Sequence, residues 1–179
     1  MKKIVLFTIL MMSLGIMASA QTVTATAVKT THRNAIAKDV VEKGTLTMKR
    51  PSEVSIVVND GKDQLLMQGS TFTMVVKGKK HVTSSERNPQ FASFQKVFES
   101  ILSGGKKALP VLSDLTVSQK GNLQTLTIVP KAEGKKASKR MMFSSFVMTI
   151  DTQTSELKTL RMNERAGYTE YVFSNYQMK

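Results

Sequence analysis

The chain has 179 residues, no cysteine and a formal net charge of +13 at pH 7. The absence of cysteine excludes a disulfide framework and a thiolate zinc site, so packing alone must stabilise the fold. The basic excess favours contact with an anionic membrane surface or an acidic partner, and solubility is the alternative explanation.

The first twenty residues have the three-part pattern of a secretory signal peptide. Lys2 and Lys3 precede an apolar run over residues 4–17, and Ala18-Ser19-Ala20 supplies a cleavage site of small residues. This run is shorter than the roughly 20 residues that a membrane-spanning helix needs. We predict a signal peptide over 1–20, cleaved after Ala20, and a soluble exported chain over 21–179 that forms a single domain. An exported protein has little access to nucleic acid, so we expect no nucleic-acid partner.

Short segments that alternate apolar and polar residues with period two run through most of the mature chain, which is typical of half-buried strands. Residues 23–31 are rich in Thr and are predicted to form the first strand. The apolar members of the later segments are Leu46, Met48, Val54, Ile56, Val58, Leu65, Met67, Phe72, Met74, Val76, Leu115, Val117, Leu126, Ile128, Phe146, Met148, Ile150, Leu160, Met162, Tyr171 and Phe173. Turns are predicted at 59–61, 77–79, 120–122, 151–155 and 166–167. Few connections are long enough for crossover helices, so we expect a mainly β fold with a mostly meandering antiparallel sheet.

One stretch, residues 88–105, predicts a helix. Asn88 is a favourable N-cap, Pro89 suits the first helical position, and Gly104-Gly105 ends the pattern. Its apolar side chains fall within an arc of about 140° at 100° per residue; they are Phe91, Phe94, Val97, Phe98, Ile101 and Leu102. The helix therefore carries an aromatic face that must pack against the sheet.

Residues 131–140 form a basic, low-complexity segment after Pro130, which we interpret as the tip of a long hairpin. A solvated loop is one interpretation. The other is a docking site for anionic lipid head groups or an acidic partner. The residues of that docking site would be Lys131, Lys135, Lys136, Lys139 and Arg140.

The sequence offers little for catalysis. His32 and His81 are far apart, and neither metal-ligand spacing nor a Gly-rich phosphate loop is present. Carboxylates such as Asp60, Asp63, Glu164 and Glu170 fall at turns or on polar strand faces, where a solvated charge is the ordinary explanation. We therefore predict no enzyme activity, no metal site and no cofactor.

The order of elements resembles the LolA-type outer-membrane lipoprotein carrier proteins of Gram-negative bacteria. The resemblance rests on the G-x-L-x-x-x-R-P pattern over Gly44–Pro51, the single amphipathic helix, and the G-x-T-x-x-x-F-x-N pattern over Gly167–Asn175. It implies a strongly curved, unclosed antiparallel sheet, shaped like half a barrel, whose concave face is covered by a helical lid. It also implies a periplasmic, monomeric carrier that takes lipoproteins from an inner-membrane transporter to an outer-membrane acceptor.

The resemblance also implies roles for particular residues. Arg50 of the Arg-Pro pair would latch the lid. Val54 and Ile56 stand where familiar members carry a Phe-x-Trp pattern, and residues 22–33 are a poor match to the usual N-terminal helix. The predicted lining of the lipid cavity and lid consists of Met48, Ile56, Met67, Phe72, Met74, Phe91, Phe94, Phe98, Ile101, Phe146, Met148, Met162 and Phe173.

Two alternatives remain open beside the lipoprotein carrier. The first is a binder of free lipid or another small apolar ligand on the same scaffold, and methionine-rich apolar surface suits such adaptable binding. The second is a cell-envelope interaction domain whose cavity is filled by its own side chains. A cavity large enough for an acyl chain would separate the carriers from the filled domain.

Overall fold

The computed structural model describes residues 21–36, 38–88, 91–104, 107–131 and 141–179. Their elements, in chain order, are β1 (Thr22–Arg33), β2 (Val40–Lys49), β3 (Glu53–Val58), the 3-10 turn η1 (Asn59–Gly61), β4 (Asp63–Gln68), β5 (Thr71–Val76), β6 (Lys79–Ser84), α1 (Ala92–Leu102), β7 (Leu115–Lys120), β8 (Leu123–Ile128), β9 (Ser145–Asp151), β10 (Glu156–Glu164) and β11 (Gly167–Met178). Within these described residues, no helix has the length and apolar character needed to cross a membrane.

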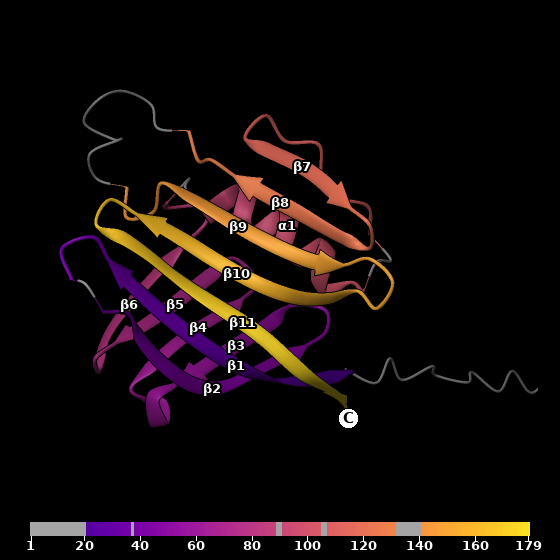
Figure 1. The fold of residues 1–179 in the computed structure, drawn as a ribbon. Helices are drawn as coiled ribbons and strands as arrows, with labels where there is room; N and C mark the ends of the chain where they lie inside the picture. The colour runs from indigo at the N-terminus through magenta and orange to yellow at the C-terminus, as the bar shows by residue number, and fades with distance from the viewer. Residues whose placement is uncertain (1–20, 37, 89–90, 105–106, 132–140) are drawn as a thin grey trace, which may run out of the picture.

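The strands of the described residues form one antiparallel sheet in the order β6-β5-β4-β3-β2-β1-β11-β10-β9-β8-β7. Two meanders, β1 to β6 and β7 to β11, are joined where the first strand pairs with the last, for example Ala27 with Phe173. The sheet is strongly curved and does not close, because β6 and β7 remain at opposite edges (Figure 1). The predicted fold class, an unclosed antiparallel half-barrel with a helix on its concave side, is confirmed.

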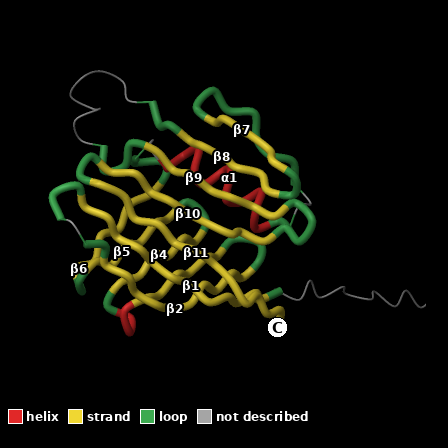
Figure 2. The backbone as a smooth tube through the Cα atoms, in the orientation of Figure 1, coloured by secondary structure: helices red, strands yellow, loops and turns green. Residues whose placement is uncertain are grey.

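Strand alternation and turn residues explain the meanders. In β9, every second residue from Phe146 to Ile150 is buried, as the period-two pattern predicted. Lys77 and Gly78 adopt φ values of 50° and 76° in the β5–β6 turn, and Ser155 adopts 55° in the β9–β10 turn. The predicted turns therefore lie between strands, as the tube in Figure 2 shows.

The predicted first strand is also confirmed, and it extends over Thr22–Arg33. Thr and Val favour strands because their branched side chains suit the pleated backbone. Val23, Ala25, Ala27 and Lys29 are its buried members. Residues 22–33, which match poorly the helix that the resemblance implies, thus form a central strand.

The helix begins later than the sequence predicted. Its N-cap is Phe91, without a side-chain capping hydrogen bond, and its first residue is Ala92. Instead, the backbone carbonyl oxygen of Asn88 accepts a hydrogen bond of 3.0 Å from the backbone N–H of Phe91. This bond makes a turn ahead of the helix. Pro89 lies outside the described residues. The prediction of Asn88 as the N-cap was wrong because Phe91 packs into an aromatic cluster, and tertiary packing overrides a local capping preference.

Candidate functional site

The concave face of the sheet is apolar, and α1 packs across its centre. Ile56, Met67 and Phe72 of the sheet meet Phe94 and Phe98 of the helix. All five side chains are almost completely buried. The cavity that these five residues line measures only about 10 Å³. In this conformation the helix itself occupies the centre of the concave face.

A cluster of phenylalanines holds the start of the helix. Phe91 stacks on Phe72 of β5 with a centroid distance of 4.8 Å, and Phe94 lies 4.8 Å from Phe146 of β9. Phe143, just before β9, lies 5.2 Å from Phe146 and was not predicted as part of the site. Such aromatic pairs contribute about 0.5–1.5 kcal/mol each beyond the burial of their area. Strands from both meanders therefore contact the same end of the helix.

Arg50 lies at the other end of α1. The helix ends at Leu102, and Gly104 has a φ of 65°, a conformation that favours glycine. A Cβ atom at Gly104 would lie 2.8 Å from the Cζ atom of Arg50, so the guanidinium packs directly against this residue. The Nη1 of Arg50 donates a hydrogen bond of 3.1 Å to the Gln21 side chain. A cation in this position faces the negative pole of the helix dipole.

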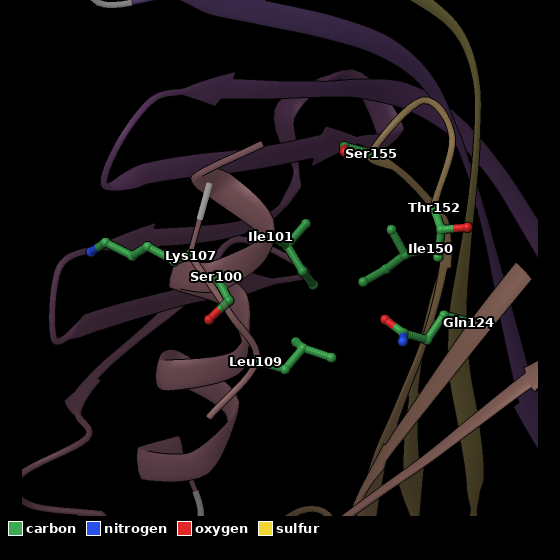
Figure 3. Close-up of a pocket in the computed structure, with 8 residues that line it drawn as sticks. All are labelled: Ser100, Ile101, Lys107, Leu109, Gln124, Ile150, Thr152 and Ser155. Atoms are coloured by element: carbon green, nitrogen blue, oxygen red, sulfur yellow. The ribbon is translucent and has the colours of Figure 1, made fainter. Parts of the chain in front are cut away.

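A cavity of about 290 Å³ opens beside the C-terminal half of α1 (Figure 3). Ser100, Ile101 and Leu109 line it from the helix side, and Gln124 and Ile150 line it from β8 and β9. Ile101 and Ile150 point toward one another across the space. The apolar groups of this cavity continue the buried face of the helix.

A second cavity, of about 360 Å³, lies at the end of the sheet where β1 ends and β2 begins. Leu65, Met74, Met162 and Tyr171 supply its apolar walls. Ile36, Val40 and Val76 also line it and are at least two-fifths exposed. We call this space the open-end cavity, because residues of α1 are absent from its described lining.

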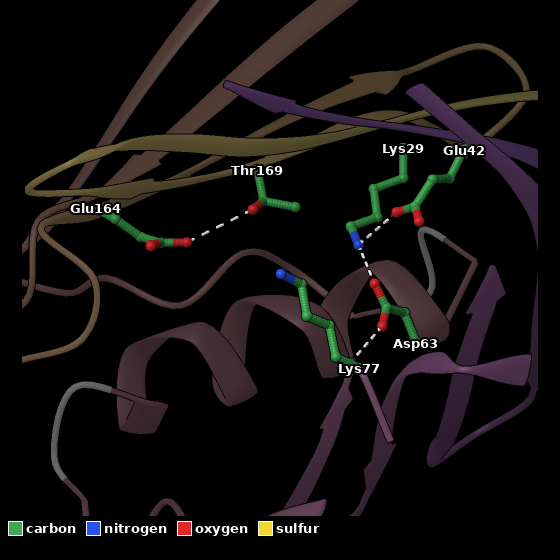
Figure 4. A network of polar contacts seen from close by, with 6 residues as sticks. All are labelled: Lys29, Glu42, Asp63, Lys77, Glu164 and Thr169. Carbon is green, nitrogen blue, oxygen red and sulfur yellow. Dashed lines mark hydrogen bonds and ion pairs between the residues drawn. The ribbon is translucent and has the colours of Figure 1, made fainter. Parts of the chain in front are cut away.

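A buried ion-pair cluster lies in the open-end cavity (Figure 4). Lys29 of β1 donates hydrogen bonds to Glu42 of β2, at 2.8 Å, and to Asp63 of β4. The backbone N–H of Lys77 donates a further bond of 2.7 Å to Asp63. Lys29 and Asp63 are 8% and 6% exposed, so these charges are removed from solvent. The prediction that Asp63 is a solvated carboxylate was wrong.

The pKa values of this cluster are set by the competition between burial and pairing. Burial acts to lower the pKa of Lys29, but the hydrogen bonds and charges of Asp63 and Glu42 outweigh it and raise that pKa above 10.5. Burial acts to raise the pKa of Asp63, and the bonds from Lys29 and Lys77 outweigh it and lower that pKa below 3.8. Burial, together with the charges of Asp63 and Glu42, raises the pKa of Tyr171. All three groups therefore keep their neutral-pH charge state across the physiological range.

Most of the predicted lining residues are brought together. Twelve of them are buried in one hydrophobic core; they are Met48, Ile56, Met67, Phe72, Phe91, Phe94, Phe98, Ile101, Phe146, Met148, Met162 and Phe173. Met74 is partly buried beside this core. Their role in binding lipid stays a prediction, because in this conformation most of them contact α1 or each other.

The predicted basic docking site falls largely outside the described residues. Lys135, Lys136, Lys139 and Arg140 lie within 132–140, which the structure does not describe. Lys131 is exposed, and its Nζ donates a hydrogen bond of 3.0 Å to the Ser113 hydroxyl. The docking role of this segment stays a prediction.

A curved half-barrel with a helix across its concave face can be compared with known families. The family model described as "Outer membrane lipoprotein carrier protein LolA" matches residues 18–179. The chain belongs to the LolA family. The resemblance predicted from Gly44–Pro51 and Gly167–Asn175 is thereby confirmed. Comparison with curated proteins finds no match.

Solved structures show a distant likeness to LolA-type folds. A LolA superfamily protein from Nitrosomonas europaea is 7% identical, with 88% of this chain and 86% of that chain covered and a TM-score of 0.34. The lipoprotein LppX of Mycobacterium tuberculosis is 14% identical, with 88% and 87% covered and a TM-score of 0.33. MucB of Pseudomonas aeruginosa, solved with MucA, is 14% identical, and this chain spans about half of it (88% and 52% covered, TM-score 0.36). The family model, not these scores, establishes the membership.

The family is described as an outer-membrane lipoprotein carrier. Among the described residues, no group of three or more His, Asp or Glu side chains is arranged to hold a metal ion. His32 pairs with Asp39 at 2.7 Å and stacks on Tyr168, which explains its position without catalysis. Val54 and Ile56, at the positions of the familiar aromatics, are both buried in the core.

Sequence reasoning missed Lys29 and Glu42 and misjudged Asp63. A signal for Lys29 was present, because it continues the alternation of Val23, Ala25 and Ala27 and so falls on the buried face of β1. No local signal identifies its partner, since Asp63 lies 34 residues further along the chain, on β4, and β2 and β3 separate that strand from β1 in the sheet.

Asp63→Asn should lower the free energy of unfolding by about 3 kcal/mol near neutral pH, because removing one partner leaves a buried charge without compensation. The folded pKa of Asp63 is lowered, so its contribution is present above the ordinary value of 3.8 and is lost as the pH falls through the folded pKa. The pKa of Lys29 is raised, so its contribution is present below 10.5 and is lost as the pH rises through its folded value. Urea unfolding of both proteins should therefore show a smaller difference at strongly acidic pH than at neutral pH.

The matched control for this measurement is Asp60→Asn, since Asp60 is exposed in the neighbouring η1 turn. It should change stability by no more than about 0.5 kcal/mol. An Asp63→Asn protein as stable as the wild type at neutral pH would contradict a stabilising role for the cluster.

Arg50→Ala should loosen α1 while leaving the sheet folded, because it removes the cation at the helix C-terminus. Such a contact is worth about 0.3–1 kcal/mol, so amide exchange in Ala92–Leu102 should accelerate about two- to fivefold. Hydrogen-exchange mass spectrometry would measure it, with Lys49→Ala as the control for loss of an adjacent exposed cation. Equal exchange in α1 for both variants would contradict a latch at Arg50.

Proposed function

We propose that this LolA family protein is an exported carrier that holds the acyl chains of lipid-modified proteins against its concave face, beneath α1, and moves them from the inner to the outer membrane. The observation that carries the proposal is the way in which α1 packs on the concave face of the sheet. Its buried face is entirely apolar apart from Ser100, and cavities of about 290 and 360 Å³ flank the part that it fills. Ligand pockets commonly measure about 300–1,000 Å³, so each of these spaces is close to the lower end of that range while the helix is in place.

The energies of helix and ligand are comparable. Six apolar side chains of the helix segment, from Phe91 to Leu102, are buried. Burial of a large apolar side chain is worth about 1.5–3 kcal/mol, which amounts to a sum on the order of 10 kcal/mol. An acyl chain of about 16 carbons offers a similar sum at about 0.8 kcal/mol per buried methylene. Exchange of the helix for an acyl chain is therefore nearly balanced, as a carrier that must also release its cargo requires.

The connections of the helix are compatible with movement. Gly104 at the C-terminal end has a positive φ, and hinge motions are absorbed by a few residues at element ends. The polar contacts of α1 with the rest of the described protein are few, such as the contact between Gln95 and Ser85. The proposal includes two partners, a transporter that delivers the cargo and an acceptor that receives it.

A second candidate is a carrier of free lipid. It is favoured by the two flanking cavities, which are present while the helix is in place and need no attached protein. The two candidates share the concave face and differ in whether the acyl chain is linked to a polypeptide.

Metabolic labelling distinguishes these candidates. Bacteria that express the full chain are fed radiolabelled palmitate, and the mature protein is purified without detergent and run on a denaturing gel. We expect the bound label to migrate as discrete protein bands other than the carrier. Label that migrates only with the dye front would mean that the ligand is free lipid and not a lipoprotein. Absence of bound label would contradict both candidates.

Cross-linking α1 to the sheet should abolish lipid uptake. The chain has no cysteine, so Ser85→Cys and Gln95→Cys provide a unique pair for a short bis-maleimide. Their side chains are in contact, and Ser85 is tied to the sheet by its N–H bond to the Ser70 carbonyl. The cross-linked protein should fail to bind a fluorescent fatty-acyl probe that the uncross-linked variant binds.

The control pair is Glu53→Cys and Gln68→Cys, which lie opposite each other on β3 and β4 and do not involve the helix. Cross-linking this pair should leave uptake unchanged. Normal uptake by the Ser85–Gln95 cross-linked protein would overturn the role of α1 as a lid.

A further inference from the structure

The mouth of the open-end cavity exposes apolar side chains. Ile36 and Val40 are each 55% exposed and Val76 is 42% exposed, although all three line the same cavity. They come from the β1–β2 connection, the start of β2 and the end of β5, so the mouth is built from segments far apart in the chain. An exposed apolar patch beside a cavity commonly marks a surface that contacts a partner or a membrane.

Exposed lysines lie on or beside the segments that form this apolar mouth. Lys77 lines the cavity, and Lys79 pairs with Val76 across the β5–β6 turn. Lys62 lies beside them, since its carbonyl accepts the N–H of Gly78 at 3.1 Å. Lys80 pairs with Val75. Together with Lys38, which lies between Ile36 and Val40 in the chain, these five exposed residues form what we call the lysine rim.

The charge of the lysine rim is not neutralised by described residues. None of its five lysines forms an ion pair with a side chain in the described part of the chain. Of the nearby carboxylates, Glu42 and Asp63 bind Lys29, Glu164 binds Arg33, and Asp39 binds His32. Asp60 is the exposed acidic residue of the η1 turn. The rim therefore presents a net positive surface around an apolar centre.

We propose that the lysine rim docks this end of the half-barrel onto an anionic phospholipid surface. Charge complementarity supports this partner, because each lysine near an anionic bilayer contributes about a fivefold gain in partitioning. Ile36, Val40 and Val76 then enter the interfacial region, where burial of apolar side chains adds to the electrostatic attraction. The docked orientation turns the mouth of the open-end cavity toward the bilayer.

This docking is distinct from the carrier function and from the basic segment at 131–140. A bilayer can be bound whether or not the concave face holds an acyl chain, so vesicles without lipoprotein test it separately.

Vesicle sedimentation tests the proposal with a matched charge change. Lys79→Glu/Lys80→Glu is compared with Lys120→Glu/Lys179→Glu, which changes the net charge equally in exposed lysines at the opposite end of the strands. The probe is a vesicle of phosphatidylglycerol and phosphatidylcholine, with pure phosphatidylcholine as reference. We expect the wild type to bind the anionic vesicles in a salt-dependent way and the rim variant to bind at least about tenfold more weakly. The control variant should lose clearly less of its binding to the anionic vesicles.

A single tryptophan reports whether the mouth inserts, because the chain has none of its own. Ile36→Trp should show blue-shifted fluorescence on addition of anionic vesicles. Leu123→Trp, at an exposed site at the opposite end, should show no shift.

Three results would overturn the proposal. They are absence of binding to anionic vesicles, equal losses in the two charge variants, and a shift at position 123 but not at 36. A fifth variant replaces Lys135, Lys136 and Lys139 by Gln. If binding is lost in that variant and retained in Lys79→Glu/Lys80→Glu, the docking surface is the 131–140 segment and the lysine rim is excluded.

Discussion

The path of the chain between the two edges of the sheet is the constraint on which the rest of the structure depends. Pairing of β1 with β11 joins two meanders at their starting and finishing strands, which leaves β6 and β7 as opposite edges. The residues between these strands must therefore cross the open side of the half-barrel. Because α1 lies in this crossing segment and has an aromatic face, it buries that face on the concave side of the sheet, and the phenylalanines of both meanders meet it there.

The concave face combines a filled centre with two unfilled ends, and the two ends differ in chemistry. Beside the C-terminal half of α1 the free space is lined largely by apolar groups, with Arg50 packed nearby against Gly104. At the open end, the Lys29 cluster places three charges among apolar walls. Replacement of a buried ion pair by apolar residues is often neutral or stabilising, so such a cluster is weak support for stability as such. Its physical consequence is a polar region that limits how far an apolar body can extend along the sheet from the helix.

The parts of the site that sequence reasoning predicted correctly were those with a local signal. Alternation in β9 identified Phe146 and Met148 as inward residues, and the helical period identified the face with Phe94 and Phe98. The failures came where a distant contact decided the outcome. Asp63 follows a turn and looks like a solvated carboxylate until β4 is brought near Lys29. Asn88 has the side chain of a helix N-cap, but the packing of Phe91 on Phe72 moved the helix start beyond it.

By itself the sequence determined the strands other than β6, the turns at residues with positive φ, the amphipathic helix and the family, because each depends on residues close together in the chain. Only the tertiary structure decided that β1 pairs with β11, so that α1 must cross the open side. It also decided that Arg50 meets the C-terminal end of the helix, and that Ile36, Val76 and Lys77 line one cavity mouth. The physical reason is the same in each case: these contacts join residues that no local periodicity relates, and they form only when the curved sheet brings its strand ends together.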